Sequence, residues 1–338
     1  MVTIALALAI YARYVGNFPF MSDESIYVYA SFALWEGGLV PYRDIYLAHP
    51  PLMYLVYGFL LKLCDLNLSY FRLSLLAIHL CSAILLYFLV KALLGRSRKF
   101  AVCIATLSMA LFATYPVDIR FGCVGIAEPL LTLTFLVSAL IAILSLQMYD
   151  NYPRRRTFLL LFIVGILLGL STSIKLTGLM FAIALVVAYL SCRIWGASSK
   201  LRALISLSYE LLVLLSGIAL IWTLTLIALW FTGALHNFYL HVFYWQIVRV
   251  ASTTLRPELK NQQLLDYFAA YLPLLPFVMV GLVAELYHAL KRTICWRPLL
   301  MLTMTYFGYI FSVFTLTRTA FTHYYVPASP LLLSLIHI

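Results

Sequence analysis

Two adjacent carboxylates, Asp23 and Glu24, stand directly after the first apolar run of the chain, in the stretch MSDESIY. Apolar side chains recur behind them at helical spacing, which predicts a short amphipathic helix that lies on a membrane surface. A carboxylate pressed against lipid is costly unless water or a partner solvates it. We therefore expect at least one of the two to be functional, and we count both as catalytic candidates. The alternative is that both only favour the start of a helix, where the helix dipole attracts negative charge.

A second acidic segment, YPVDIRFGCVGIAEPLL, lies where one apolar run ends and the next begins. Glu128 precedes Pro129, at which an unbroken apolar helix starts, so its carboxylate is expected at the mouth of a helix bundle and is a second catalytic candidate. A carboxylate buried there needs a cation, and Arg120 is one candidate partner. Asp118 and Arg120 are also candidates for substrate binding.

Lys175 is the one cation in the turn GLSTSIKLTGLMF between two long apolar runs. A lone cation inside a membrane is expensive and usually marks a pathway or an anionic partner. We expect the Lys175 ammonium to meet either a ligand phosphate or Glu128. A lysine whose ammonium snorkels to the membrane surface is the alternative.

A late segment, TRTAFTHYYVPASP, carries three further candidates for substrate binding: Arg318, His323 and Tyr324. The forked donors of Arg318 suit a phosphate, and an aromatic ring suits a sugar or a polyprenyl chain. Tyr324 fits equally well in the belt of aromatic residues at a membrane interface.

His49 stands before two prolines in PYRDIYLAHPPL. The prolines bias His49 away from helical geometry, so the chain should turn a corner there. A histidine held at a corner beside an acidic loop can bind phosphate, ligate a metal or orient a carboxylate. The alternative is a hydrogen-bonded loop histidine without such a role.

The composition is that of a polytopic membrane protein. Of the 338 residues, 64% are hydrophobic and only 10% are charged, whereas about a quarter are charged in a soluble domain. Because the backbone must satisfy its own hydrogen bonds in lipid, and no alternating barrel pattern is present, we expect an all-α bundle. The net charge of +11 falls in short clusters between the apolar runs, which is typical of membrane topology and not of nucleic-acid binding.

About ten spans are expected, and their charges predict the sidedness of the chain. If residues 51–66 lie at the interface, the basic clusters at 91–99, 154–156, 193–202 and 291–297 all fall on the cytoplasmic face. Most acids then fall on the outer face, beside two long outer loops at 17–69 and 232–266. Long loops in a compact protein are usually functional, so the chemistry is expected on the outer face. The spans are expected at about 1–16, 70–92, 100–117, 128–148, 157–173, 177–195, 204–231, 267–290, 298–316 and from 326 onward.

The last six residues, LSLIHI, are what the transposase end of a sequencing adapter would encode. We therefore expect one domain over residues 1–332, cut short at its C-terminal side and clipped at its short first span, with a tail at 333–338. An ordinary apolar segment is the alternative for the tail.

In the order of these motifs the chain resembles the multi-spanning glycosyltransferases of the GT-C superfamily. The resemblance is particularly to the branch that holds protein O-mannosyltransferases, the aminoarabinose transferase of lipid A, and the RgtA/B/C/D-like family. The resemblance rests on the acidic pair at Asp23, on PYRDIYLAHPPLMYLVYGFL, YPVDIRFGCVGIAEPLL and GILLGLSTSIKLTGL, and on HYYVPASPLLL. It extends over essentially the whole chain, and it is specific for the superfamily but not for a substrate.

The resemblance implies extracytoplasmic transfer of a sugar from a polyprenyl-phosphate donor, dolichyl or undecaprenyl, to a protein, lipid or glycan acceptor. Asp23 matches the catalytic acid of the first loop, and Glu128 matches an acidic position of the second. His49 stands where the aminoarabinose transferases carry a lysine, and Ala48 replaces the glutamate before it, which weakens the case for a metal bound in that way.

No cofactor is required by the sequence. The acidic pairs are compatible with a divalent cation such as Mg²⁺ or Mn²⁺, but no ligand spacing demands one. A flippase for lipid-linked sugars or another membrane transporter is the alternative function, because such proteins also use charges at membrane depth. A non-catalytic assembly subunit is a third one, since a fold does not guarantee activity.

Overall fold

The computed structural model describes residues 2–12, 22–94, 99–148, 154–195, 200–245, 247–248, 257–274, 276, 278–280, 283, 296–316 and 322–335. Over these ranges the backbone is helical apart from short connections, and an isolated bridge between Pro41 and Ile45 is the one β pairing that they show. The expectation of an all-α fold is therefore confirmed.

Six described helices are long and apolar enough to cross a membrane, or seven if α5 (Lys99–Thr114) and α6 (Pro116–Gly122), which meet at 61°, are counted as one bent span. Pro116 explains the bend, because it cannot donate the backbone hydrogen bond that would continue α5. The six are α4 (Leu68–Leu94), α7 (Glu128–Met148), α8 (Arg154–Ile174), α9 (Thr177–Trp195), α10 (Lys200–Phe231) and α15 (Trp296–Leu316).

The expected number of about ten spans is larger than the described residues show. Helix α1 (Val2–Tyr11) has 10 residues, which is about 15 Å of helix and too short for a hydrocarbon core of about 30 Å. Helix α16 (Ser329–Leu335) is shorter still. Of the span expected at 267–290, residues 275, 277, 281–282 and 284–290 lie outside the described residues. The described part holds the end of α13 (Pro257–Ala270) and the short η3 (Leu272–Leu274). Leu333 and Ser334, in the expected tail, are buried within α16.

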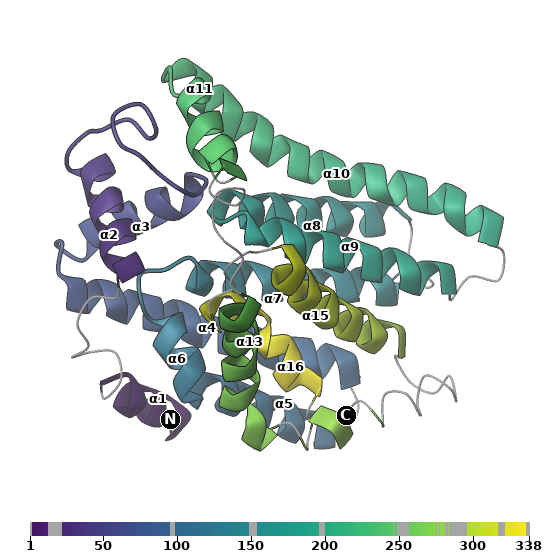
Figure 1. The fold of residues 1–338 in the computed structure, drawn as a ribbon. Helices are drawn as coiled ribbons and strands as arrows, with labels where there is room; N and C mark the ends of the chain where they lie inside the picture. Colours follow the sequence, from purple (N-terminus) through teal and green to yellow (C-terminus); the bar gives the residue numbers. More distant parts are fainter. Residues whose placement is uncertain are drawn as a thin grey trace.

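Helices α2 (Ser22–Trp35) and α3 (Leu52–Leu63) pack side by side at one end of the bundle, where α11 (Leu235–Phe238) also lies (Figure 1). Trp35 donates from Nε1 to the carbonyl of Leu55 at 2.9 Å. Gly58 makes room for that ring, because a Cβ at this position would lie 1.7 Å from it. The stretch expected at the membrane interface is thus a helix of 12 residues.

Helix α10 lies along the edge of the bundle and packs mainly on α8 (Figure 1). Glycines permit a close approach: a Cβ on Gly165 would lie 2.1 Å from the carbonyl oxygen of Leu214, and one on Gly217 would lie 2.5 Å from that of Phe162. Such small-residue contacts are typical of helix pairs in membranes.

The basic cluster expected around residues 193–202 differs in the structure. Arg193 is buried and donates from Nη2 to Oε1 of Glu210 at 2.9 Å, and Tyr189 and Ser206 also donate to this carboxylate. This side chain therefore joins α9 to α10 and is not part of a solvated loop cluster. Lys200 and Arg202 have side chains outside the described set.

Candidate active site

A buried ion pair joins Glu128 and Lys175. Glu128 is the first residue of α7, and Lys175 lies in the short link between α8 and α9. The distance from Lys175 Nζ to Glu128 Oε1 is 2.8 Å, and the side chains are 4% and 1% exposed, respectively. Glu128 is thus the partner of Lys175 in this structure, one of the two that the sequence predicts. Lys175, and not Arg120, neutralises Glu128.

Two residues of η4 (Thr322–Ala328) complete the surroundings of this pair. Lys175 Nζ lies 4.1 Å from the centre of the Tyr324 ring, a cation–π distance. His323 Nε2 lies 4.0 Å from Glu128 Oε1. Glu128 Oε2 is buried and has no hydrogen-bond partner among the described residues. The two residues predicted near the end of the sequence therefore meet the pair predicted in the middle.

The charges at this site shift the pKa values of its neighbours. Burial alone would lower the pKa of Lys175, but Glu128, Tyr324 and Asp23 together outweigh it, so the pKa of the ammonium is raised. Burial lowers the pKa of His323, although Glu128 acts in the opposite direction. Lys175 is therefore protonated and His323 neutral at pH 7.

Asp23 faces the same site from the start of α2. Its negative charge contributes to the raised pKa of Lys175 and acts upward on that of His323, which places it near both. The Asp23 side chain is half-buried, and no described residue forms a hydrogen bond or ion pair with its carboxylate. An accessible carboxylate without such a partner is the form that a general base requires.

Glu24 points to a different part of the structure. It receives hydrogen bonds from Arg72 Nε at 2.9 Å and Nη2 at 2.5 Å, and from the backbone N–H of Gly125 at 3.0 Å. The Glu24 and Arg72 side chains are 0% and 3% exposed. This carboxylate is enclosed and bonded to Arg72 and Gly125, which speaks against the expected catalytic role of Glu24; its contact with Arg72 joins α2 to α4.

The loop of residues 123–127, which leads into Glu128, is held by the same contacts. Gly125 is bound by Glu24, and the hydroxyl of Tyr57 donates to the carbonyl of Ile126. A Cβ at Gly125 would lie 2.9 Å from the side chain of Val28. Glu24 therefore connects α2, the helix that carries Asp23, with the loop that leads to Glu128.

His49 reaches the site through Tyr27. The Tyr27 hydroxyl and His49 Nε2 are 2.9 Å apart, and Tyr42 donates to the backbone carbonyl of His49 at 2.7 Å. Burial, followed by the charge of Asp23, raises the pKa of Tyr27, so its hydroxyl stays protonated. Tyr42 holds this corner with a left-handed backbone, φ 64°. The expected corner at His49 is present, but a second residue separates it from the ion pair.

The structure does not bring the remaining candidates to the ion pair. Asp118 is buried in α6, where its Oδ1 accepts hydrogen bonds from Tyr271 and Ser329 at 2.6 Å each. These contacts tie α6 to later segments and speak against the predicted role in substrate binding. Arg120 is exposed, and its guanidinium lies 5.6 Å from the centre of the Phe121 ring. Arg318 lies outside the described residues.

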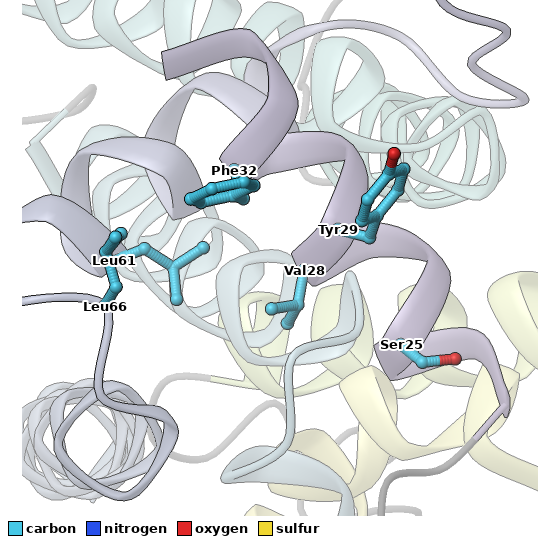
Figure 2. Close-up of a pocket in the computed structure, with 6 residues that line it drawn as sticks. All are labelled: Ser25, Val28, Tyr29, Phe32, Leu61 and Leu66. Atoms are coloured by element: carbon cyan, nitrogen blue, oxygen red, sulfur yellow. The ribbon is translucent and has the colours of Figure 1, made fainter. Parts of the chain in front are cut away.

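An apolar groove of about 400 Å³ lies on the other side of α2. Figure 2 shows Val28 and Phe32 of α2 turned toward Leu61 and Leu66. At about 3.6 residues per turn, Phe32 is about two and a half turns beyond Asp23 and so lies on the opposite face of the helix. The groove is therefore separate from the charged site.

No metal site is evident in the described part of the chain, where no group of three or more His, Cys, Asp or Glu side chains is arranged to hold an ion. The charged site instead offers three functions on adjacent side chains. Asp23 can accept a proton, Lys175 can stabilise a developing anion, and Glu128 has an oxygen that can accept a hydrogen bond.

Sequence comparisons give no relative: no family model matches the chain. No curated protein matches it either.

Solved structures share its fold. ArnT from Cupriavidus metallidurans in the apo state superposes with a TM-score of 0.64 at 18% identity, over 99% of this chain and 58% of that one. The same protein bound to undecaprenyl phosphate superposes with a TM-score of 0.62 at 19% identity, over 99% of this chain and 59% of that one. A third structure is the archaeal oligosaccharyltransferase AglB from Archaeoglobus fulgidus, in complex with an inhibitory peptide and a dolichol-phosphate. It superposes with a TM-score of 0.63 at 13% identity, over 99% of this chain and 49% of that one. The chain therefore shares the fold of these proteins, as the resemblance led us to expect, and it spans about half to three-fifths of their length.

Proposed function

We propose that this protein transfers a sugar from a polyprenyl-phosphate donor to a protein, lipid or glycan acceptor, as a hexosyl- or pentosyltransferase. The observation that carries the proposal is the buried Glu128–Lys175 pair, with Asp23 close enough for its charge to act on Lys175. Support also comes from the shared fold, because the ArnT structure holds undecaprenyl phosphate and the AglB structure holds a dolichol-phosphate.

The proposed reaction is a single displacement at the anomeric carbon. Asp23 takes the proton from an acceptor hydroxyl or amine as that group attacks, and a new glycosidic bond forms. The bond between the anomeric carbon and the phosphate oxygen breaks, and its electron pair leaves with the polyprenyl phosphate. Lys175 stabilises the negative charge on that leaving group. Attack from the side opposite the phosphate inverts the configuration of the sugar.

The membrane explains why the base lies on α2. The polyprenyl chain can stay in the bilayer while its phosphate sits at the water boundary, so the acidic group must lie at that boundary too. Six described helices have the length and composition of membrane spans, and the protein is an integral membrane protein. We place Asp23 and α2 at the interface of the extracytoplasmic face of the cell membrane, with the acceptor arriving from the aqueous side.

A matched pair of variants tests this proposal. Asp44 is an exposed acid of the same outer segment, paired with Arg43 at 2.9 Å. Glycans and lipids from cells that carry the wild type, Asp23→Asn or Asp44→Asn are compared by mass spectrometry. We expect a sugar modification that Asp23→Asn abolishes and Asp44→Asn retains. A well-expressed Asp23→Asn with full transfer would refute the assignment of the base. No observation on the described residues favours the flippase alternative.

A further inference from the structure

The cation that the proposed reaction needs is already neutralised. Lys175 Nζ lies 2.8 Å from Glu128 Oε1, and both side chains are buried. Among the described residues, the basic groups within 4.0 Å of the Glu128 carboxylate are those of Lys175 and His323. His323 is neutral at pH 7 because burial lowers its pKa, so Lys175 is the cation that pairs with Glu128. A phosphate that approaches Lys175 therefore meets a carboxylate of its own sign. Two anions cannot share one buried ammonium without a cost in electrostatic free energy.

We propose that Glu128 occupies, in the absence of substrate, the position on Lys175 that the phosphate of the lipid donor takes, and that donor binding exchanges one anion for the other. This inference rests on the proposed function, since it assumes a polyprenyl-phosphate ligand. It adds to that function a competition within the site: Glu128 limits the affinity for the phosphate until the exchange has occurred.

Contacts that do not involve Glu128 keep Lys175 in place during the exchange. The backbone N–H of Lys175 donates to the carbonyl of Ser171 at 3.3 Å, and its own carbonyl accepts from Gly178 at 2.8 Å. The ammonium also lies over the ring of Tyr324 at 4.1 Å. A cation–π contact of this kind is favourable whichever anion approaches from the other side. The cation is thus held for the incoming phosphate.

Glu128 also has an alternative to Lys175. It is the first residue of α7, whose first backbone N–H groups have no partner within the helix and whose dipole favours negative charge. Its Oε2 is buried without a hydrogen-bond partner among the described residues, so one carboxylate oxygen has unused capacity to accept a hydrogen bond. After the exchange both oxygens can accept hydrogen bonds from hydroxyl groups of the donor sugar, next to Asp23.

The exchange predicts that removing the charge of Glu128 improves phosphate binding. When a competing internal contact occupies a site, the apparent affinity falls by the fraction of molecules in which the site is open. If that fraction is about 1–10%, Glu128→Gln should bind the phosphate about 10- to 100-fold more tightly. A purely structural role of the ion pair predicts the reverse, because a damaged site binds its ligand more weakly.

The probe is undecaprenyl phosphate, which carries no sugar, so binding is measured without turnover. Its dissociation constant is determined by intrinsic tryptophan fluorescence in detergent for the wild type, Glu128→Gln, Lys175→Gln and the control Asp44→Asn. We expect tighter binding by Glu128→Gln, loss of binding by Lys175→Gln, and no change for the control. If Glu128→Gln fails to fold, Glu128→Asp replaces it: its carboxylate is shorter by one carbon–carbon bond of about 1.5 Å, and a smaller tightening is expected.

The outcomes separate the two proposals. If the wild type binds undecaprenyl phosphate and Glu128→Gln binds it equally or more weakly, the exchange is wrong while the proposed function stands. Full binding by Lys175→Gln overturns the exchange as well, since the phosphate would then lie elsewhere. If neither the wild type nor any variant binds undecaprenyl phosphate, the proposed polyprenyl-phosphate donor is wrong, and the proposed exchange is wrong as well.

Discussion

Arg72 allows the packing of the site to be tested separately from its chemistry. Replacing Arg72 by methionine keeps the apolar stem and removes the guanidinium. Glu24 then remains fully buried with one hydrogen bond, from Gly125, in place of three. A hydrogen bond to a charged group contributes about 1.5–3 kcal/mol. The loss of these two bonds should therefore lower the free energy of unfolding by about 3–5 kcal/mol, the range found when one partner of a buried ion pair is removed.

The assay is reversible unfolding in mixed SDS micelles, with a double variant and an exposed control. Glu24→Gln combined with Arg72→Met removes the buried charge but leaves an amide oxygen for Gly125, so we expect it to recover most of the lost stability. The control is Arg43→Met. Arg43 also forms two hydrogen bonds with a carboxylate, that of Asp44, at 2.9 and 3.0 Å, but the side chains are 51% and 30% exposed. We expect no measurable change for the control.

Two results would refute this reasoning. One is a decrease in the free energy of unfolding of less than about 1 kcal/mol for Arg72→Met, which is the range of an exposed ion pair. The other is a double variant no more stable than the single one, because an uncompensated charge on Glu24 would then not be the cause. Either result would mean that the Arg72–Glu24 contact does not fix α2 against α4.

Two further predictions concern helix packing and pH. Gly165→Ala should destabilise the protein by about 1–3 kcal/mol in the same unfolding assay, because its Cβ would lie 2.1 Å from the carbonyl oxygen of Leu214. Gly308→Ala is the control, since the atom nearest to its Cβ would be the Cβ of Ala184 at 3.2 Å, and an equal loss of stability in both variants would contradict the packing. Burial lowers the pKa of His323, so between that lowered value and about 6.5 the unfolded chain binds one more proton than the native one. Stability should therefore fall as pH drops below about 6.5, and more steeply in the wild type than in His323→Gln. Melting temperatures measured from pH 7.5 to 5 that fall equally steeply in both proteins would argue against a buried neutral His323.

Much of this fold could be predicted from the sequence, because long apolar runs can satisfy their backbone in lipid only as helices. Asp23, Glu128 and Lys175 could also be singled out, since ionisable groups at the ends of such runs are costly and need a reason. For the partner of Lys175 the sequence leaves two alternatives, Glu128 and a ligand phosphate. The choice between them depends on how α7 packs against the link between α8 and α9, which no local pattern encodes.

The parts that could not be predicted depend on contacts between distant helices. Arg72 lies inside an apolar run of 27 residues, and a lone arginine there was the available signal for a buried acidic partner. That partner is Glu24, the neighbour of Asp23, and sequence alone could not decide which of the two carboxylates turns inward. The sequence also gives no sign that Glu210 of α10 turns inward to pair with Arg193 of the preceding helix, α9. Burial of Asp118 by Tyr271 depends on a contact across 153 residues.

The most direct test of a glycosyltransferase site at Asp23 is the release of polyprenyl phosphate by purified protein. The substrates are a panel of radiolabelled polyprenyl-phosphate sugars, with a membrane extract that supplies the acceptor. Our account predicts that the wild type and Asp44→Asn release polyprenyl phosphate from at least one donor and pass its label to the acceptor, while Asp23→Asn releases none. Intact donors throughout, or equal release by Asp23→Asn, would contradict it.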